Sequence, residues 1–142
     1  MTSLERLKER IFRAGDINDP ATARPLVSLE EFFDGNDDFG SIGYNFYPDQ
    51  PAPSDFYELF KRIRSRPEVA NVLVEVCQQE MPEEWPSTDT VWIITSASAG
   101  TVAKWLGERF QADDIFDGWT EHVQREPYQL PPGMKPIGIW WD

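Results

Sequence analysis

Cysteine and histidine are scarce in this sequence of 142 residues, which has one cysteine, Cys77, and one histidine, His122. A single cysteine excludes a disulfide within the chain and favours a reducing compartment. The longest clean apolar run, Val91–Ile94, is far shorter than the roughly 20 residues of a membrane span. Residues 1–8 are charged and amphipathic rather than the apolar centre of a signal peptide. We therefore expect a cytoplasmic protein.

Basic residues are also few relative to acidic ones. Thirteen Lys and Arg residues face 25 Asp and Glu residues, and the formal net charge is −12. Between Pro25 and Phe60 there are eight carboxylates and no Lys or Arg. Such a field repels phosphate backbones and anionic lipid, so the sequence argues against nucleic-acid and membrane-surface binding. It favours encounter with a basic protein partner, although acidity that simply keeps a Trp-rich domain soluble is the plainer alternative.

Short β-branched and aromatic runs bounded by turn residues predict strands, and apolar residues at helical spacing predict helices. The strands are expected over Ser41–Tyr47, Val69–Gln78, Thr90–Ser96 and Pro136–Asp142, and the helices over Ser54–Arg66 and Ser98–Phe110. Gln111–Gly133 is expected to be long and irregular, with a turn of helix near Asp114.

The first forty residues predict two further helices. Thr2 or Ser3 can cap the first, which runs to about Arg13, and Ser28 with Glu31 forms a capping box for a short second helix. From Ser41 onward the order β-α-β-β-α-β predicts an α+β, ferredoxin-like fold: an antiparallel sheet with two helices on one face. We expect a single domain with a helical extension over residues 1–40 and an α+β core over residues 41–142.

The helix-free face of this predicted sheet would expose large apolar side chains. Leu73, Trp92 and Ile94 are expected to point out of that face. Exposed apolar patches of this kind need a cover. We expect either the first forty residues or a second subunit, making a homodimer, to provide it.

Three segments resemble a known protein family. They are Val27-Ser-Leu-Glu-Glu-Phe-Phe-Asp-Gly-Asn-Asp-Asp continuing through Gly40-Ser-Ile-Gly, then Thr95-Ser-Ala-Ser with Trp105-Leu106, and the closing Trp140-Trp141-Asp142. The family is one of small acidic bacterial proteins described as uncharacterised. The resemblance implies a bacterial, intracellular, single-domain protein, and it implies no activity, cofactor or catalytic residue.

The segment Asp34–Gly40 is the most suggestive local pattern for a metal. Asp34, Asn36 and Asp38 place oxygen ligands at alternating positions, as a calcium loop does. The match fails at the sixth position, which is Phe39, and at the twelfth, which is Asn45. The alternative is a helix stop followed by an Asx-rich turn. No metal or other cofactor is therefore predicted, and these three residues are weak metal candidates.

Other patterns for chemistry have simple structural explanations. The small residues of Ser96–Thr101 could let backbone amides meet an anion, but Ser98 as a helix N-cap explains the segment equally well. Cys77 lies on a predicted strand and His122 in a distant loop, with no motif that joins them. We expect both to be structural, and a cleft in which they converge with several acids would contradict that expectation.

The tryptophans provide the other candidate site. Trp85, Trp119 and Trp140 lie in loops or on the outer face of the last strand, and Glu83 and Glu84 adjoin Trp85. Exposed Trp with a charged rim suits an interface anchor for a protein partner. The alternative is that the loop tryptophans fold back onto the second face of the sheet.

Three function classes follow from these patterns. We favour a non-catalytic acidic domain that binds or inhibits a basic protein partner, an immunity protein being one form of it. The first alternative is a small-ligand or anion sensor that uses the sheet face or the Ser96–Thr101 turn. The second is a divalent-metal-dependent enzyme that uses Asp34 and Asp38.

Overall fold

The computed structural model describes residues 1–46 and 48–142, and its centre is one five-stranded sheet. Every neighbouring pair is antiparallel, in the order β1-β2-β3-β5-β4. The strands are β1 (Leu26–Ser28), β2 (Val69–Gln78), β3 (Ser87–Thr95), β4 (Asp114–Asp117) and β5 (Lys135–Trp140). The α+β class is confirmed.

The described residues also form four α-helices and one 3-10 turn: α1 (Ser3–Ile11), η1 (Phe12–Ala14), α2 (Leu29–Phe33), α3 (Pro53–Arg64) and α4 (Ala99–Leu106). The capping box of α2 is confirmed, because Ser28 Oγ accepts the Glu31 N–H and the Glu31 carboxylate accepts the Ser28 N–H. The longest described helix, α3, has 12 residues, and none of the described helices combines the length and hydrophobicity of a membrane span.

The prediction of a strand over Ser41–Tyr47 is wrong for residues 41–46, and Tyr47 lies outside the described residues. The segment turns at Gly43, whose φ of +66° lies in the left-handed region. A Cβ at this position would come within 2.7 Å of the Phe56 ring, so the chain approaches the core more closely than a strand with side chains could. Ile42, Tyr44 and Phe46 therefore do not form one buried face as they would in a strand, because Ile42 is buried while Tyr44 is exposed.

Because residues 41–46 form no strand, the sheet topology differs from the predicted one. Without that strand the sheet has no parallel central pair, and the observed strand order is not a simple ferredoxin-like one. Residues expected to be irregular supply strand β4 instead of a turn of helix near Asp114. Residues 1–40, expected to be a helical extension, also contribute β1 to the sheet, and Leu7 and Phe32 belong to the main core.

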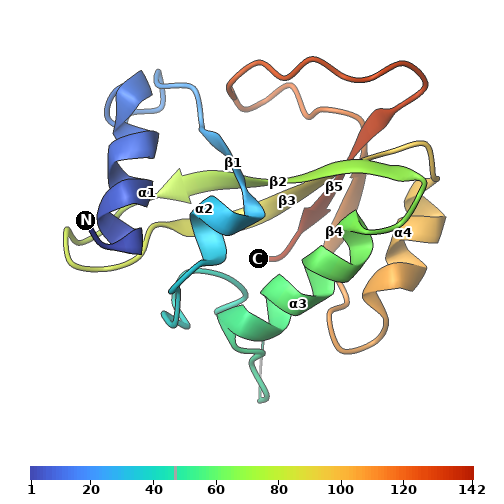
Figure 1. The fold of residues 1–142 in the computed structure, drawn as a ribbon, viewed down its shortest axis with the longest axis horizontal. Helices are drawn as coiled ribbons and strands as arrows, with labels where there is room; N and C mark the ends of the chain where they lie inside the picture. The colour runs from blue at the N-terminus through green and yellow to red at the C-terminus, as the bar shows by residue number, and fades with distance from the viewer. Residues whose placement is uncertain (47) are drawn as a thin grey trace.

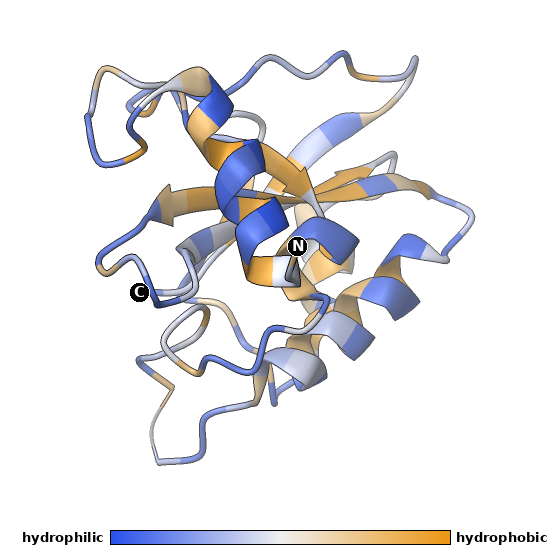
Figure 2. Cartoon of the chain, turned by 60° about the vertical axis from the view of Figure 1, so that its left-hand side comes forward, coloured by the Kyte–Doolittle hydropathy of each residue, from blue (hydrophilic) through white to orange (hydrophobic). Residues whose placement is uncertain are grey.

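The main core lies between one face of the sheet and the helices. Figure 1 shows α3 and α4 on the same side of the sheet, with α1 at the end where β2 turns into β3. Figure 2 shows the hydrophobic strands inside and hydrophilic residues on the outward sides of the helices. Phe56 and Phe60 of α3 meet Trp141 with ring centroids 5.4 and 5.9 Å apart. Burial of such large rings contributes about 1.5–3 kcal/mol for each side chain.

The second face of the sheet is covered by the chain's own residues. Leu73, Trp92 and Ile94 are buried there, as the alternation of the strands predicted. Most of the cover comes from Phe116, Trp119, Tyr128, Leu130 and Met134, and Leu26, from the first forty residues, belongs to the same cluster. The segment that carries most of them passes over the sheet opposite α3 and α4 (Figure 1). The reason for expecting a homodimer through this face is thereby removed.

Candidate functional site

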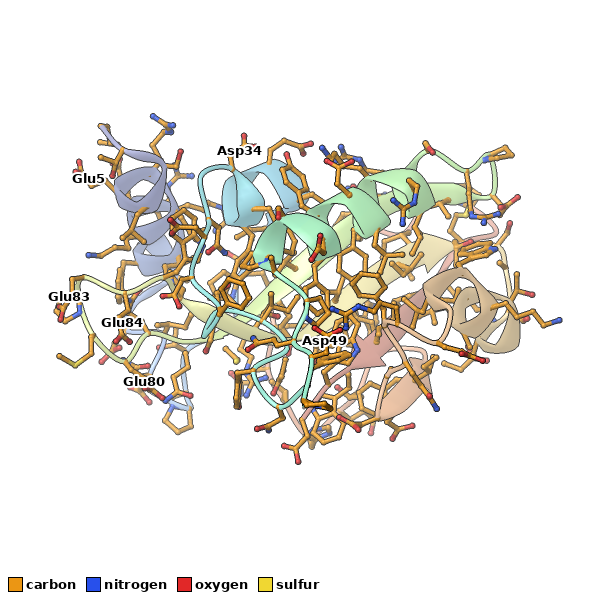
Figure 3. All side chains as sticks on the ribbon, turned by 90° about the horizontal axis from the view of Figure 1, so that it is seen from below. Glu5, Asp34, Asp49, Glu80, Glu83 and Glu84 are labelled. Carbon is orange, nitrogen blue, oxygen red and sulfur yellow. The ribbon has the colours of Figure 1, made fainter. Side chains whose placement is uncertain are left out.

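An acidic hollow of about 320 Å³ opens beside the loop that joins β2 to β3. Its walls come from two loops, residues 38–44 and 80–85, from the end of β2 and from the first residue of β3. We call it the acidic hollow, and it is lined by Asp38, Gly40, Tyr44, Gln78, Glu80, Glu84, Trp85 and Ser87. In Figure 3 Glu80, Glu83 and Glu84 lie together at this end of the molecule.

Trp85 is the fixed wall of the acidic hollow. Its ring Nε1–H donates to the Phe32 carbonyl at 2.9 Å, and its backbone N–H donates to Asp38 Oδ2 at 3.2 Å. The ring is half-buried against the main core. Trp85 is therefore held by the α2 end of the molecule and presents only part of its surface to the hollow.

The loop that carries the glutamates is also held in place. Gln79 is buried, and its Nε2 donates to the carbonyls of Met81 and Glu84. Lys8 of α1 donates to the Pro82 carbonyl, which brings one ammonium group to the same loop. The side chains of Glu80, Glu83 and Glu84 are left exposed. Such bonds between loop and core pre-organise the carboxylates without neutralising them.

The electrostatic field of the acidic hollow is negative. Tyr44 is 55% exposed, and its pKa is raised above the ordinary value. Partial desolvation is the largest cause, and smaller coulombic effects, that of Glu80 among them, add to it. Desolvation disfavours charge of either sign, so the sign of the field comes from the exposed carboxylates of Glu80 and Glu84 that line the hollow. These carboxylates beside the Tyr44 and Trp85 rings suit a positively charged group.

The candidate metal residues are directed to different partners within the chain. Asp34 accepts the Tyr57 hydroxyl proton at 2.9 Å, and burial with this bond raises the pKa of Tyr57 to about 12. Asn36 is buried and bonds the Phe32 carbonyl and Ser41 Oγ. Asp38 accepts the N–H groups of Gly40 and Trp85. Among the described residues no group of three or more His, Cys, Asp or Glu is suited to a metal ion.

The other candidate residues serve the fold or lie elsewhere. Ser98 Oγ accepts the Thr101 N–H at 3.2 Å as the N-cap of α4. Trp119 folds back onto Trp92 with ring centroids 4.7 Å apart, as the alternative explanation held. Trp140 is half-buried on the second face, away from Trp85. The three predicted tryptophans therefore do not share one patch, and only Trp85, with Glu84, lines the acidic hollow.

A buried ion cluster, which the sequence reasoning missed, lies under the second face. Glu75 is 1% exposed, and its carboxylate meets Arg24 Nη1 at 2.9 Å and Arg125 Nε at 2.8 Å. Trp92 Nε1–H donates to the same carboxylate at 3.0 Å, and the Arg125 guanidinium lies 5.0 Å from the Trp92 ring centroid. One signal was available: Glu75 is a lone acid within a run of Val and Leu.

The expectation that Cys77 and His122 lie apart is wrong. Both line a hollow of about 720 Å³ that is bordered by residues 17–24, together with Asp19 and Glu80. No hydrogen bond joins the two side chains within the described residues. The Cys77 Sγ–H instead donates to the Ser87 carbonyl at 3.4 Å. Burial, with the negative charge of Asp89, raises the pKa of the Cys77 thiol to about 11. A thiol of that pKa is not a nucleophile at neutral pH.

Alkylation tests this description of Cys77. A pKa of about 11 against an ordinary value of 9.0 leaves the thiolate fraction at pH 7 about 100-fold lower than in the unfolded chain. We expect iodoacetamide to react with the native protein about 100-fold more slowly than with the protein in urea. The native rate should keep rising as the pH approaches 11. A native rate that levels off below pH 9 would contradict the raised pKa.

The similarity to known proteins covers nearly the whole chain. The model of a family described as "Uncharacterized protein YfbO family" matches residues 2–139. A relative from Escherichia coli (strain K12), "Uncharacterized protein YfbO", is 40% identical over 142 residues, which is 100% of both chains. No solved structure matches. The match therefore spans the segments of this chain that form the hollows and the buried ion cluster, and the names of the family and the relative state no activity.

Proposed function

This chain belongs to the uncharacterized YfbO protein family, and from its geometry we propose a non-catalytic domain whose acidic hollow receives a Lys or Arg side chain of a basic protein partner. The observation that carries the proposal is the pairing of exposed carboxylates with aromatic walls in one hollow. Glu80 and Glu84 provide the charge, and Tyr44 and Trp85 provide the rings. A guanidinium group can bond carboxylates and stack on a ring at the same time.

The charge of the whole chain supports the same proposal. A net charge of −12 attracts a basic surface over several ångströms and speeds encounter with it. The exposed apolar side chains Phe39, Tyr44 and Met81 lie in the two loops that form the hollow or next to them. They would provide the desolvated centre that a stable interface needs within a charged rim. A protein that neutralises a basic toxin, as an immunity protein does, is one form of this function.

The contacts of the candidate residues support binding over catalysis. Asp34 and Asp38 are bonded to separate groups of the chain, and the raised pKa of Cys77 keeps that side chain protonated. A single cysteine, which forms no disulfide within the chain, suits the reducing cytoplasm, which is the location we propose.

Calorimetry with a basic peptide tests the proposal. The probe is an acetylated and amidated Gly-Ser-Arg-Lys-Ser-Gly peptide, compared with the same peptide carrying Gln in place of Arg and Lys. We expect Glu80→Gln combined with Glu84→Gln to weaken binding of the basic peptide about tenfold or more, because two charge-assisted contacts are lost. Both side chains are exposed, so the variant should fold normally.

A matched pair of substitutions separates the hollow from net charge. Glu58→Gln with Glu108→Gln removes the same charge from exposed positions on α3 and just after α4. This control variant should bind the basic peptide within about twofold of the unmodified protein, since distant exposed charges are screened by salt. Equal weakening in the two double variants, or equal affinity for the neutral peptide, would refute the proposed site.

A further inference from the structure

A third hollow, on the face of the sheet that carries Trp92, shares no lining residue with the acidic hollow and adjoins the hollow of Cys77 through Arg24 and His122. It has a volume of about 330 Å³ and lies between strands β3, β4 and β5 and the segment that follows β4. This volume is at the lower end of small-molecule sites, which span roughly 300–1,000 Å³. We call it the second-face hollow, and the lining residues that matter are Arg24, Asp89, Asp114, Phe116, His122 and Trp140.

The floor of the second-face hollow is the buried ion cluster. Glu75 lines it and is held between Arg24 and Arg125. Arg24 also lies 4.0 Å from Asp89. A buried carboxylate with two guanidinium groups costs more to desolvate than an apolar side chain of the same size, so it is weak as a device for stability alone. It does hold Arg24 at the bottom of the hollow with a fixed orientation.

Charge in this hollow argues against an anionic ligand, because Glu75, Asp89 and Asp114 line it together with Arg24. Arg24 has carboxylates on two sides, so it offers no excess positive charge to an anion. A cation could pair with Asp114 but could not accept hydrogen bonds from the N–H groups of Arg24. A neutral ligand with hydroxyl groups can bond both the carboxylates and the guanidinium group.

Hydrogen-bonding groups remain available around the rim. Among the described residues, Arg24 Nη1 makes the one side-chain hydrogen bond that this guanidinium donates, which leaves its other N–H groups for a ligand. Asp89 and Asp114 each use one oxygen, for the Thr90 hydroxyl and the Ile115 N–H respectively, and keep the second. His122 is exposed and supplies a further donor and acceptor. Donors and acceptors placed side by side match hydroxyl groups, which both donate and accept.

Aromatic surface completes the lining. Trp140 is half-buried on β5 and Phe116 is half-buried on β4, and both border the hollow. Flat rings of this kind pack against the C–H face of a small saturated ring while the polar groups bond its edge. We propose that the second-face hollow binds a neutral polyhydroxylated ligand of about the size of one sugar ring.

Titration of hydroxylated probes tests this inference. D-glucose, D-galactose, D-mannose and myo-inositol are each added to the protein, and binding is followed by saturation-transfer NMR and calorimetry. Putrescine and inorganic phosphate serve as charged probes. We expect saturable binding of at least one hydroxylated probe below about 50 mM, and weaker or no binding of the charged probes.

Two aspartates at the ends of β4 provide a matched pair of variants. Asp114→Ala removes a carboxylate that lines the hollow and should weaken binding of the hydroxylated probe about tenfold or more. Asp117→Ala removes an exposed carboxylate that pairs with Lys135 outside the lining, and it should leave that affinity unchanged. Both side chains are exposed on an edge strand, so both variants should fold, which a thermal melt verifies.

Three outcomes would overturn the inference. They are the absence of saturable binding by every hydroxylated probe, preferential binding of putrescine or phosphate, and equal effects of the two aspartate variants. None of them bears on the basic-peptide experiment, because that experiment uses residues of the acidic hollow.

Discussion

Replacing Glu75 by alanine should lower the free energy of unfolding by about 3–5 kcal/mol, because it leaves two partly buried guanidinium groups without their carboxylate. The Trp92 Nε1–H, which is buried, also loses its acceptor. Unsatisfied buried donors of this kind cost about 1–3 kcal/mol. Urea denaturation of the variant and the unmodified protein at neutral pH measures the difference.

Glu30 provides the control for this prediction. Its carboxylate also meets an arginine closely, Arg64, at 2.7 and 2.6 Å, but Glu30 is exposed. Glu30→Ala should therefore cost only about 0–1 kcal/mol. A Glu75→Ala variant that loses no more stability than Glu30→Ala would contradict a larger contribution from the buried cluster than from an exposed ion pair.

Replacing Gly138 by alanine should destabilise the protein by about 1–3 kcal/mol through overpacking. Gly138 lies directly opposite Trp92 in the β3–β5 ladder. A Cβ at this position would lie 2.6 Å from Trp92 Cζ3 and 2.8 Å from Cη2. The indole cannot move away easily, because it is fully buried and bonded to Glu75.

A double-mutant cycle shows whether the Trp92 ring is the cause. The cost of Gly138→Ala is measured again in a Trp92→Leu background, where the rigid ring is gone. We expect the cost to fall by about 1 kcal/mol or more, since the two residues are in contact and their effects should not add. Equal costs in both backgrounds would contradict an indole clash and would indicate a backbone effect instead.

Local signals made much of the fold predictable. The bounds of β2 are those predicted from its Val-rich alternation, and Ser28 and Ser98 cap helices as expected because a cap depends only on residues three positions away. The segment 41–46 shows the limit of such signals. Its alternation imitates a strand, and only the approach of Gly43 to Phe56 of α3 makes it a turn.

The candidate site was predictable only in part. Trp85 and Glu84 do line the acidic hollow, but Tyr44 enters it from a segment that was expected to be a strand. The ion cluster joins Glu75 to Arg24 and Arg125, which lie 51 and 50 positions away in the sequence. No spacing rule connects residues at such separations. Arg125 reaches Glu75 from the segment between β4 and β5 that packs on the second face, and the predicted topology gave that segment no position.

The most direct measurement for the acidic hollow is an NMR titration with the basic Gly-Ser-Arg-Lys-Ser-Gly peptide that follows the six tryptophan indole N–H signals. If the hollow receives the basic side chain, the Trp85 indole signal and the backbone signals of Tyr44 and Glu84 shift saturably. The indole signals of Trp119 and Trp140, on the other face of the sheet, stay in place. Shifts spread evenly over all six indoles, or confined to Trp119 and Trp140, would contradict the proposal.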